Sequence, residues 1–340
     1  MVEVALQISG HLRDVCDGHR LEPLRSLVQA CRGAATRCDV FLHTWDSLEP
    51  TTSTWHKIKP AAAKSSFACV EKLHTALDIA AVEVMAQQPA RMAHHNRTWA
   101  YITPWGDVQK VTSISMAGVR ASILGVAAAA ALRRTYEGTV SSGRTYQLVV
   151  RLRPDLYPRH GRQYGAPNGQ VCSIPAEAWK VMVAAAAADE AADGAVGAAV
   201  HGCDDDAVPG DKGSDMCLWG VPRAMDALFT SWVTTAAHHI DANVCWQDWR
   251  RTRPAADWRD SPCAGLADKS LLSYPEFILR AAIRSAGMNA TRLRCPAEGC
   301  VGNRPQARDQ IRQTAYCPHR KHPAARNATL RLLARGVVWR

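Results

Sequence analysis

The sequence predicts an α/β protein in which helices flank a mostly parallel sheet, and two features of the chain carry this prediction. Near the amino terminus, apolar strands at residues 4–8 and 38–43 enclose a helical segment at 21–32, which is the spacing of a right-handed β-α-β unit. Further along, an alanine-rich helix over 115–136 leads to a third apolar strand that begins at Tyr146. The alternation of helix and strand therefore continues through the first half of the chain.

The remaining elements are expected from the same patterns. Residues 64–87 have helical periodicity, and residues 94–110 are irregular with Trp99, Tyr101 and Trp105 in a polar setting. These aromatic side chains could form a wall against a sugar or base, or they could pack in the core. Short strands are expected at 169–174 and 216–219, helices at 176–192, 222–239 and 275–285, and loop at 241–270.

The composition is that of an ordinary folded protein, with 47% hydrophobic and 21% charged residues. No run of about 18 apolar residues lacks a charge, so no transmembrane segment is expected. The net charge of +10 is concentrated in residues 280–340, which hold 13 Lys and Arg against Glu298 and Asp309. This segment suits an acidic polysaccharide or a peripheral anionic surface, or it is a solvated arginine-rich surface. Spaced arginines without stacking aromatics argue against nucleic acid.

The cysteines and the asparagines bear on the compartment. There are 12 cysteines and no C-x-x-C pair, and the late cysteines of 295–317 lie in loop-like sequence, where disulfides or a zinc site are both open. Three N-x-T sequons predict glycosylation at Asn96, Asn289 and Asn327. Together these features favour the lumen of the secretory pathway, such as the Golgi. Because residues 1–6 have no basic segment of a secretion signal, a cytoplasmic location is the alternative.

The most informative motif is the end of the third predicted strand. The apolar run 148–150 is followed by Arg151, Arg153 and Asp155, and Pro154 ends the strand because it cannot donate to a sheet ladder. In open α/β sheets, ligands bind outside the carboxyl ends of the strands. Arg153 and Asp155 could hold a phosphorylated ligand there, or a sugar with a metal. The alternative is a local ion pair that caps the strand, with Arg151 as structural support further inside.

Two other segments carry candidate site residues. Gly10 follows the first strand and permits close approach of a ligand to the backbone, and Arg13 could meet a phosphate; a tight turn with a surface arginine is the alternative. Asp204 and Asp206 could bind a divalent cation through oxygen ligands, or belong to a solvated loop. Asp215 precedes the short strand at 216–219, where a carboxylate could act as a base, bind a hydroxyl or form a turn.

The order of these motifs resembles that of the glycosyltransferase-like proteins related to lipopolysaccharide- and capsule-synthesis enzymes, which occur in bacteria and algae. The resemblance covers about residues 3–290, and it depends on the order of short motifs. The motifs are Ile8-Ser9-Gly10-His11-Leu12-Arg13, Asp39-Val40-Phe41-Leu42-His43-Thr44-Trp45, Ser113-Ile114-Ser115-Met116, Tyr146 to Leu156 with R-x-R-P-D, Ser214-Asp215-Met216 through Trp219-Gly220, and Tyr274-Pro275-Glu276-Phe277-Ile278-Leu279.

The resemblance implies a Rossmann-like sheet of the GT-A type in residues 1–290, followed by a basic, loop-rich, Cys-containing extension over 291–340. It implies a hexosyltransferase-like enzyme that moves a sugar from a nucleotide-diphosphate sugar to a glycan or glycoconjugate. The alternative is a non-catalytic carbohydrate- or anion-binding protein on the same scaffold.

By position, the resemblance implies that Gly10, Arg13 and Arg153 bind the nucleotide donor. It implies that Asp155 and Asp215 are catalytic residues. Met216 stands where that pattern often has Gln. No D-x-D motif follows a strand, so Mn²⁺ or Mg²⁺ would be held by Asp155, Asp204 or Asp206.

Overall fold

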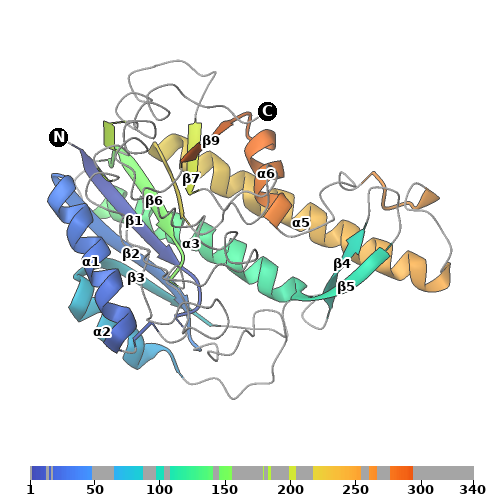
Figure 1. Ribbon diagram of the computed structural model, residues 1–340, viewed down its shortest axis with the longest axis horizontal. Coiled ribbons are helices and arrows are strands. Elements are labelled where there is room, and N and C mark those ends of the chain that lie inside the picture. The colour runs from blue at the N-terminus through green and yellow to red at the C-terminus, as the bar shows by residue number, and fades with distance from the viewer. Residues whose placement is uncertain are drawn as a thin grey trace, which may run out of the picture.

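The predicted α/β class is confirmed: a mostly parallel sheet lies between two layers of helices (Figure 1). The computed structural model describes residues 2–12, 15–16, 18–47, 65–86, 97–102, 108–140, 145–154, 179, 183–184, 199–203, 217–253, 260–265 and 276–293.

The main sheet of the described residues has seven strands in the order β3-β2-β1-β6-β8-β7-β9. β8 is antiparallel to β6 and to β7, and the other neighbouring pairs are parallel. Their bounds are β1 Glu3–Ser9, β2 Arg37–Trp45, β3 Ile79–Met85, β6 Leu148–Leu152, β7 Ala199–Cys203, β8 Cys217–Gly220 and β9 Asn289–Leu293.

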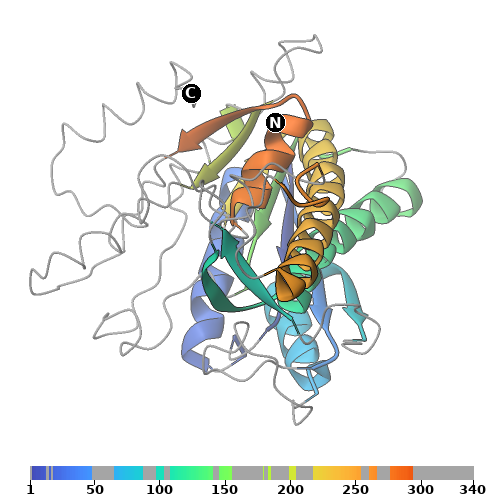
Figure 2. The same ribbon diagram turned by 90° about the vertical axis from the view of Figure 1, so that its right-hand side faces the viewer.

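The helices form one layer on each face of this sheet. α1 (Gly18–Ala34) and α2 (Phe67–Leu77) bury their apolar side chains against one face. α3 (Met116–Thr139), α5 (Pro222–Thr252) and α6 (Glu276–Ser285) cover the other, and Figures 1 and 2 show these three helices together on that side. Because both faces are covered, the central strands must be largely apolar, as β1 and β6 are.

The first β-α-β unit is confirmed. β1 pairs with β2 in parallel, with Val4 opposite Cys38, and α1 makes the crossover between them. Side chains of β1 alternate between the layers: Leu6 and Ile8 face α1 and α2, whereas Ala5 faces α3 and α5.

α3 lies over β1, β2 and β3 and packs against α5 in the same layer. Its length and composition alone would allow it to cross a membrane, and 50% of its apolar window is buried inside the molecule. Arg133 on α3 is 1% exposed and pairs with Asp226 of α5, with Nη2 at 2.6 Å from Oδ1. This pair ties the two helices together where the guanidinium has lost its water.

The stretch 94–110, expected to be irregular, contains two strands. β4 (Thr98–Ile102) and β5 (Val108–Ser115) form an antiparallel ribbon beside the second half of α5. Trp99 is fully buried, so core packing is its role. The Asn243 side chain on α5 accepts from the Ala100 N–H and donates to the Ala100 carbonyl, which fixes the ribbon to the helix.

Two sequence-based expectations were wrong. The helix predicted over 64–87 ends at Leu77, because Asp78 adopts a left-handed conformation with φ of 49° and Ile79–Met85 forms β3 along β2. The helix expected to end at 239 continues to Thr252, so residues 241–252 are not loop. Buried Asn243 and Trp246 hold this added part of α5 in place. The residues expected to form a strand at 169–174 lie outside the described part of the chain.

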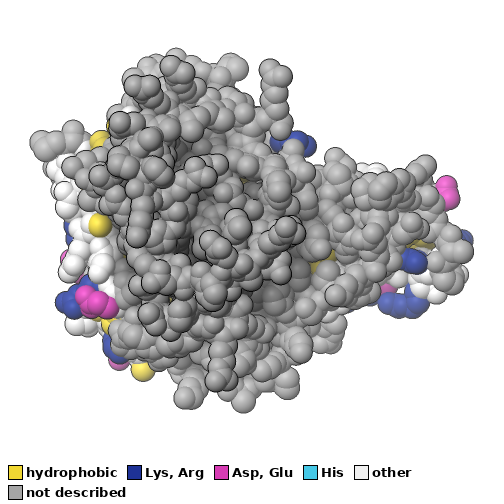
Figure 3. All heavy atoms as spheres, in the orientation of Figure 1, with side chains coloured by type: hydrophobic (Ala, Val, Ile, Leu, Met, Phe, Trp, Pro, Cys, Tyr) yellow, Lys and Arg dark blue, Asp and Glu magenta, His cyan; other side chains and the backbone are white. Residues whose placement is uncertain are grey.

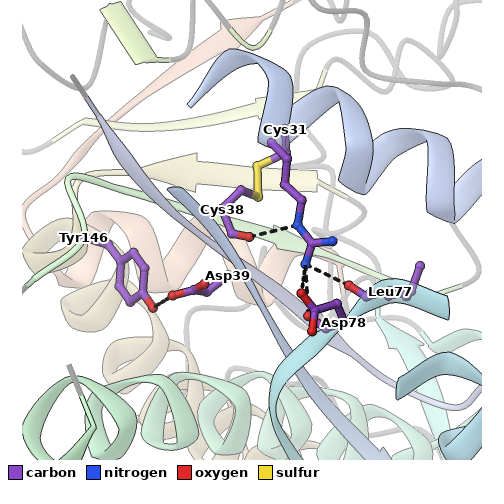
Figure 4. Close-up of a disulfide and its surroundings, with 7 residues drawn as sticks. Cys31, Cys38, Asp39, Leu77, Asp78 and Tyr146 are labelled. Carbon is purple, nitrogen blue, oxygen red and sulfur yellow. Dashed lines mark hydrogen bonds and ion pairs between the residues drawn. A yellow bond between two sulfur atoms is a disulfide. The ribbon is translucent and has the colours of Figure 1, made fainter. Parts of the chain in front are cut away.

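Three disulfides link described residues: Cys16–Cys69, Cys31–Cys38 and Cys245–Cys263. Their Cα atoms lie 5.5, 6.0 and 5.8 Å apart, which is ordinary for a disulfide. The first joins Cys16, just before α1, to α2, the second joins α1 to β2 (Figure 4), and the third joins α5 to the segment 260–265.

Arg32, beside the Cys31–Cys38 disulfide, caps the end of α2. Its guanidinium donates to the carbonyls of Leu77 and Asp78 at 2.9 Å each. The last carbonyls of a helix have no partner within the helix, so this arginine satisfies them.

Candidate functional site

The sheet changes direction of winding between its two central strands. From β1 the chain moves outward to β2 and then β3, whereas β6 begins the other half of the sheet. The order β3-β2-β1-β6 is that of the first four strands of a doubly wound nucleotide-binding sheet. In such sheets the ligand binds outside the carboxyl ends of the two strands at the reversal. Here those ends are Ser9 and Leu152.

The segments that follow these two strand ends touch. Gly10 has a φ of 137°, and a Cβ built on it would lie 3.2 Å from Cδ of Pro154. Only glycine adopts this backbone conformation without strain and leaves room for the proline ring. The Gly10 N–H also donates to the His43 carbonyl at 3.3 Å, which ties β2 to the same place. Two motifs that lie about 140 residues apart in the chain are therefore neighbours.

Arg153 stands at this junction. It directly follows β6, is half-buried, and precedes Pro154, whose ring contacts Gly10. The structure therefore brings together two of the predicted donor-site residues, Gly10 and Arg153. The other predicted site residues lie outside the described part of the chain: Arg13, Asp155, Asp204, Asp206 and Asp215.

The end of β2 adds aromatic side chains to this edge. His11 Nδ1 lies 3.4 Å from the Ser47 carbonyl oxygen, and the His11 ring lies 6.1 Å from the Trp45 ring. Trp45 in turn meets His43 edge to face at 5.2 Å. The sequence motif contained these residues, but no pattern in it assigned them to a site.

Below this junction, one face of the sheet carries polar side chains where an apolar layer is expected. Gln7 and Ser9 of β1, His43 of β2 and Arg151 of β6 alternate with residues of the α1–α2 layer, so they face α3 and α5. Gln7 lies opposite Arg151, and Ser9 lies opposite His43. All four are buried, with exposures of 0%, 1%, 0% and 1% in chain order.

Several atoms of this polar group have no hydrogen-bond partner in the structure. They are both amide atoms of Gln7, Oγ of Ser9 and both ring nitrogens of His43, and Nε1 of Trp232 on α5 joins them. Leaving one such atom buried and unpaired costs about 1–3 kcal/mol. A whole domain is stable by only about 5–15 kcal/mol, so a set of this size requires an explanation.

Arg151 occupies the inner position expected for it. Its guanidinium carbon lies 5.9 Å from the centre of the Trp232 ring, across the sheet–helix interface. This cation–π contact and its burial hold the strand end against α5. Of the two arginines that follow the apolar run of β6, Arg151 is buried inside the strand and Arg153 lies at the carboxyl edge of the sheet.

His43 is kept neutral by its surroundings. Burial is the main cause, and the charge of His11 adds to it; together they lower the pKa of His43 to about 4. α3 approaches closely at Gly125, where an added Cβ would lie 3.1 Å from His43 Nδ1. Near neutral pH the ring therefore presents one donor and one acceptor.

A second polar cluster lies at the opposite, amino edge of the sheet. The Tyr146 hydroxyl donates to Asp39 at 2.5 Å (Figure 4), and Arg37 pairs with the same carboxylate at 2.6 Å. Burial, followed by the bond to Asp39, raises the pKa of the Tyr146 phenol well above its usual range. Because ligands of such sheets bind at the carboxyl edge, we assign this cluster to stability.

The expected metal and glycosylation sites are placed only in part. Among the described residues, no group of three His, Cys, Asp or Glu could hold a metal ion. Asn289 is the first residue of β9, at the edge of the sheet. Asn96 and Asn327 lie outside the described residues.

In the face shown in Figure 3, most of the visible charged side chains of the described residues lie toward the two ends of the long axis. Lys or Arg and Asp or Glu side chains occur close to one another there.

Comparisons with known proteins leave the site to be interpreted from its own geometry: no protein-family model, no curated protein and no solved structure matches this chain.

Proposed function

We propose that this protein is a GT-A-like glycosyltransferase that moves a sugar from a nucleotide-diphosphate sugar to a glycan or glycoconjugate. The observation that carries the proposal is the contact between the Gly10 turn and Pro154 where the sheet reverses its winding. Both segments belong to the motifs that resemble this family, and that position is where α/β sheets bind nucleotides.

The chemistry assigned to the residues follows from the reaction. An acceptor hydroxyl oxygen bonds to the anomeric carbon, the bond from that carbon to the phosphate oxygen breaks, and the nucleoside diphosphate leaves with the electron pair. Arg13 and Arg153 would bind the diphosphate and stabilise its developing charge. Asp215 or Asp155 would take the acceptor proton if the reaction inverts.

A divalent cation would supply the same charge stabilisation as the arginines. Mn²⁺ or Mg²⁺ prefers carboxylate oxygens, and Asp155, Asp204 and Asp206 are the residues proposed to hold it.

The proposal is tested with nucleotides and with two variants. A nucleoside diphosphate should raise the melting temperature of the full chain, and turnover should be measurable as release of that diphosphate from a panel of nucleotide sugars. Asp155→Asn and Asp215→Asn should each lower turnover at least 100-fold, as expected when a positioned acid–base group is lost. Asp78→Asn is a matched control, because Asn tolerates the left-handed conformation at that exposed turn.

Two outcomes would contradict the proposal. No thermal response to any nucleoside diphosphate would exclude the donor site. Nucleotide-sugar or glycan binding without turnover, in the presence of Mn²⁺ or Mg²⁺, would favour the non-catalytic carbohydrate-binding alternative.

We also propose that the protein works in the lumen of the secretory pathway. Three disulfides among the described residues support this, because such bonds form and persist in oxidising compartments. Expression in a secretory host should give protein in which these six cysteines resist alkylation without reduction and Asn289 carries a glycan, both measurable by mass spectrometry. Reduced cysteines and an unmodified Asn289 would favour the cytoplasm.

A further inference from the structure

A set of neutral polar side chains lies just below the proposed donor site, between the sheet and the α3–α5 layer. It consists of Gln7, Ser9, His43 and Trp232, each at most 5% exposed. None of their side-chain nitrogen and oxygen atoms has a hydrogen-bond partner in the structure. We call this set the neutral polar cluster.

The cluster is confined to one part of one face. Closer to the amino edge, the same face is lined by Ala5, Phe41 and Val149, which belong to the apolar core. Moving toward the carboxyl edge, the next residues of the same alternation are Gln7, His43 and Arg151. On this face, polar side chains therefore replace apolar ones as the strands approach the carboxyl edge of the sheet. They do so on the neighbouring strands β1, β2 and β6.

The chemistry of the cluster matches a neutral group rich in hydroxyls. Gln7, Ser9 and neutral His43 can each donate and accept a hydrogen bond, and the Trp232 indole donates one. Each hydroxyl of a sugar also donates and accepts. The rings of Trp45 and Trp232 add aromatic surface beside these groups, since Trp45 meets His43 and Trp232 lies under Arg151.

We propose that Gln7, Ser9 and His43 bind the hydroxyl groups of the sugar carried by the nucleotide diphosphate; this inference rests on the proposed function. Gln7 and Ser9 lie on β1, whose carboxyl end leads into the Gly10 turn, so a sugar held there would be adjacent to a diphosphate bound at Arg153. The absence of a side chain at Gly125 is part of the same arrangement, since a Cβ there would crowd His43.

The variants Gln7→Leu and Ser9→Ala test whether these unpaired polar side chains bind a sugar or are only poorly packed. Each removes buried polar atoms with little change in volume, so the free protein should melt at the same or a higher temperature than the wild type. Each should also weaken binding of the nucleotide sugar about tenfold, while the dissociation constant of the nucleoside diphosphate changes less than twofold.

Thr44→Val is the matched control. Thr44 is fully buried, and its Oγ1 has no hydrogen-bond partner either, but it follows His43 on β2 and so faces the opposite layer. This variant should also keep or raise the melting temperature, and it should bind nucleotide sugars as the wild type does.

The measurement is isothermal titration of the full chain with UDP, GDP and their glucose, galactose, N-acetylglucosamine and mannose derivatives, with a melting curve for each variant. Loss of the preference for the sugar-bearing nucleotide in Gln7→Leu and Ser9→Ala, but not in Thr44→Val, supports the inference. If both variants keep that preference, the inference is wrong and ordered water accounts for the cluster. If no nucleotide binds the wild type, the proposed function fails and the sugar site fails with it.

Discussion

The buried, neutral His43 makes the stability of this protein depend on pH in a way that one substitution can isolate. The pKa of His43 is lowered by folding from 6.5 to about 4. Between these values the unfolded chain binds a proton that the folded protein does not, so the free energy of unfolding falls as the pH falls. The stabilisation that depends on a neutral His43 is fully present above pH 6.5, and it is lost progressively as the pH falls toward 4.

The size of this effect follows from the shift. One pKa unit corresponds to about 1.4 kcal/mol, so His43 should remove about 3 kcal/mol of stability between pH 7 and pH 4. No discount for solvent is needed, because the side chain has no exposed surface. A loss of that size is a large part of the stability of an ordinary domain.

Urea denaturation at half-unit steps from pH 7 to pH 4 measures this loss of unfolding free energy. The wild type is compared with His43→Gln. Other groups titrate in this range in both proteins, so the difference between their pH profiles isolates His43. His74→Gln, on the exposed side of α2, is the control and should follow the wild type. If His43→Gln loses the same free energy as the wild type over this range, then the ring is hydrated or paired in solution, and the reasoning from burial is refuted.

Two further predictions concern the backbone of the site and the helix layer behind it. Gly10→Ala should lower the free energy of unfolding by about 1–3 kcal/mol and weaken nucleoside diphosphate binding, because its φ of 137° is strained for alanine and the new Cβ would lie 3.2 Å from Pro154. Asp226→Asn should cost about 3 kcal/mol in urea denaturation, because buried Arg133 loses its closer carboxylate and keeps only Glu137 at 3.7 Å, whereas Glu22→Gln at an exposed pair should cost less than 1 kcal/mol.

Much of the fold could be predicted because local pattern and tertiary contact agree. The strands at Glu3–Ser9 and Arg37–Trp45 and the helix between them have clear periods, and they form the expected parallel unit. The strand Leu148–Leu152 ends just before Arg153 and Pro154, as the proline requires. In these segments no long-range contact overrides the local preference.

The two misjudged segments depend on partners that are distant in the chain. Ile79–Met85 contains Ala, Glu and Met, which favour helix, but its backbone pairs with β2 and the sheet decides its conformation. The second half of α5 looks like a polar, tryptophan-rich loop. It is helical because Asn243 bonds to β4, about 140 residues away in the chain, and the Cys245–Cys263 disulfide joins this helix to the segment 260–265.

Some of the site residues that sequence reasoning missed did carry a signal. They are polar residues near the ends of strands that are otherwise apolar. A central parallel strand is covered on both faces and should be apolar at every position. β1 breaks that rule at Gln7 and Ser9, β2 at His43 and β6 at Arg151, all on the face toward α3 and α5, whereas buried Thr44 of β2 lies on the other face. Their concentration below the Gly10–Pro154 contact supports the sugar site that we propose there.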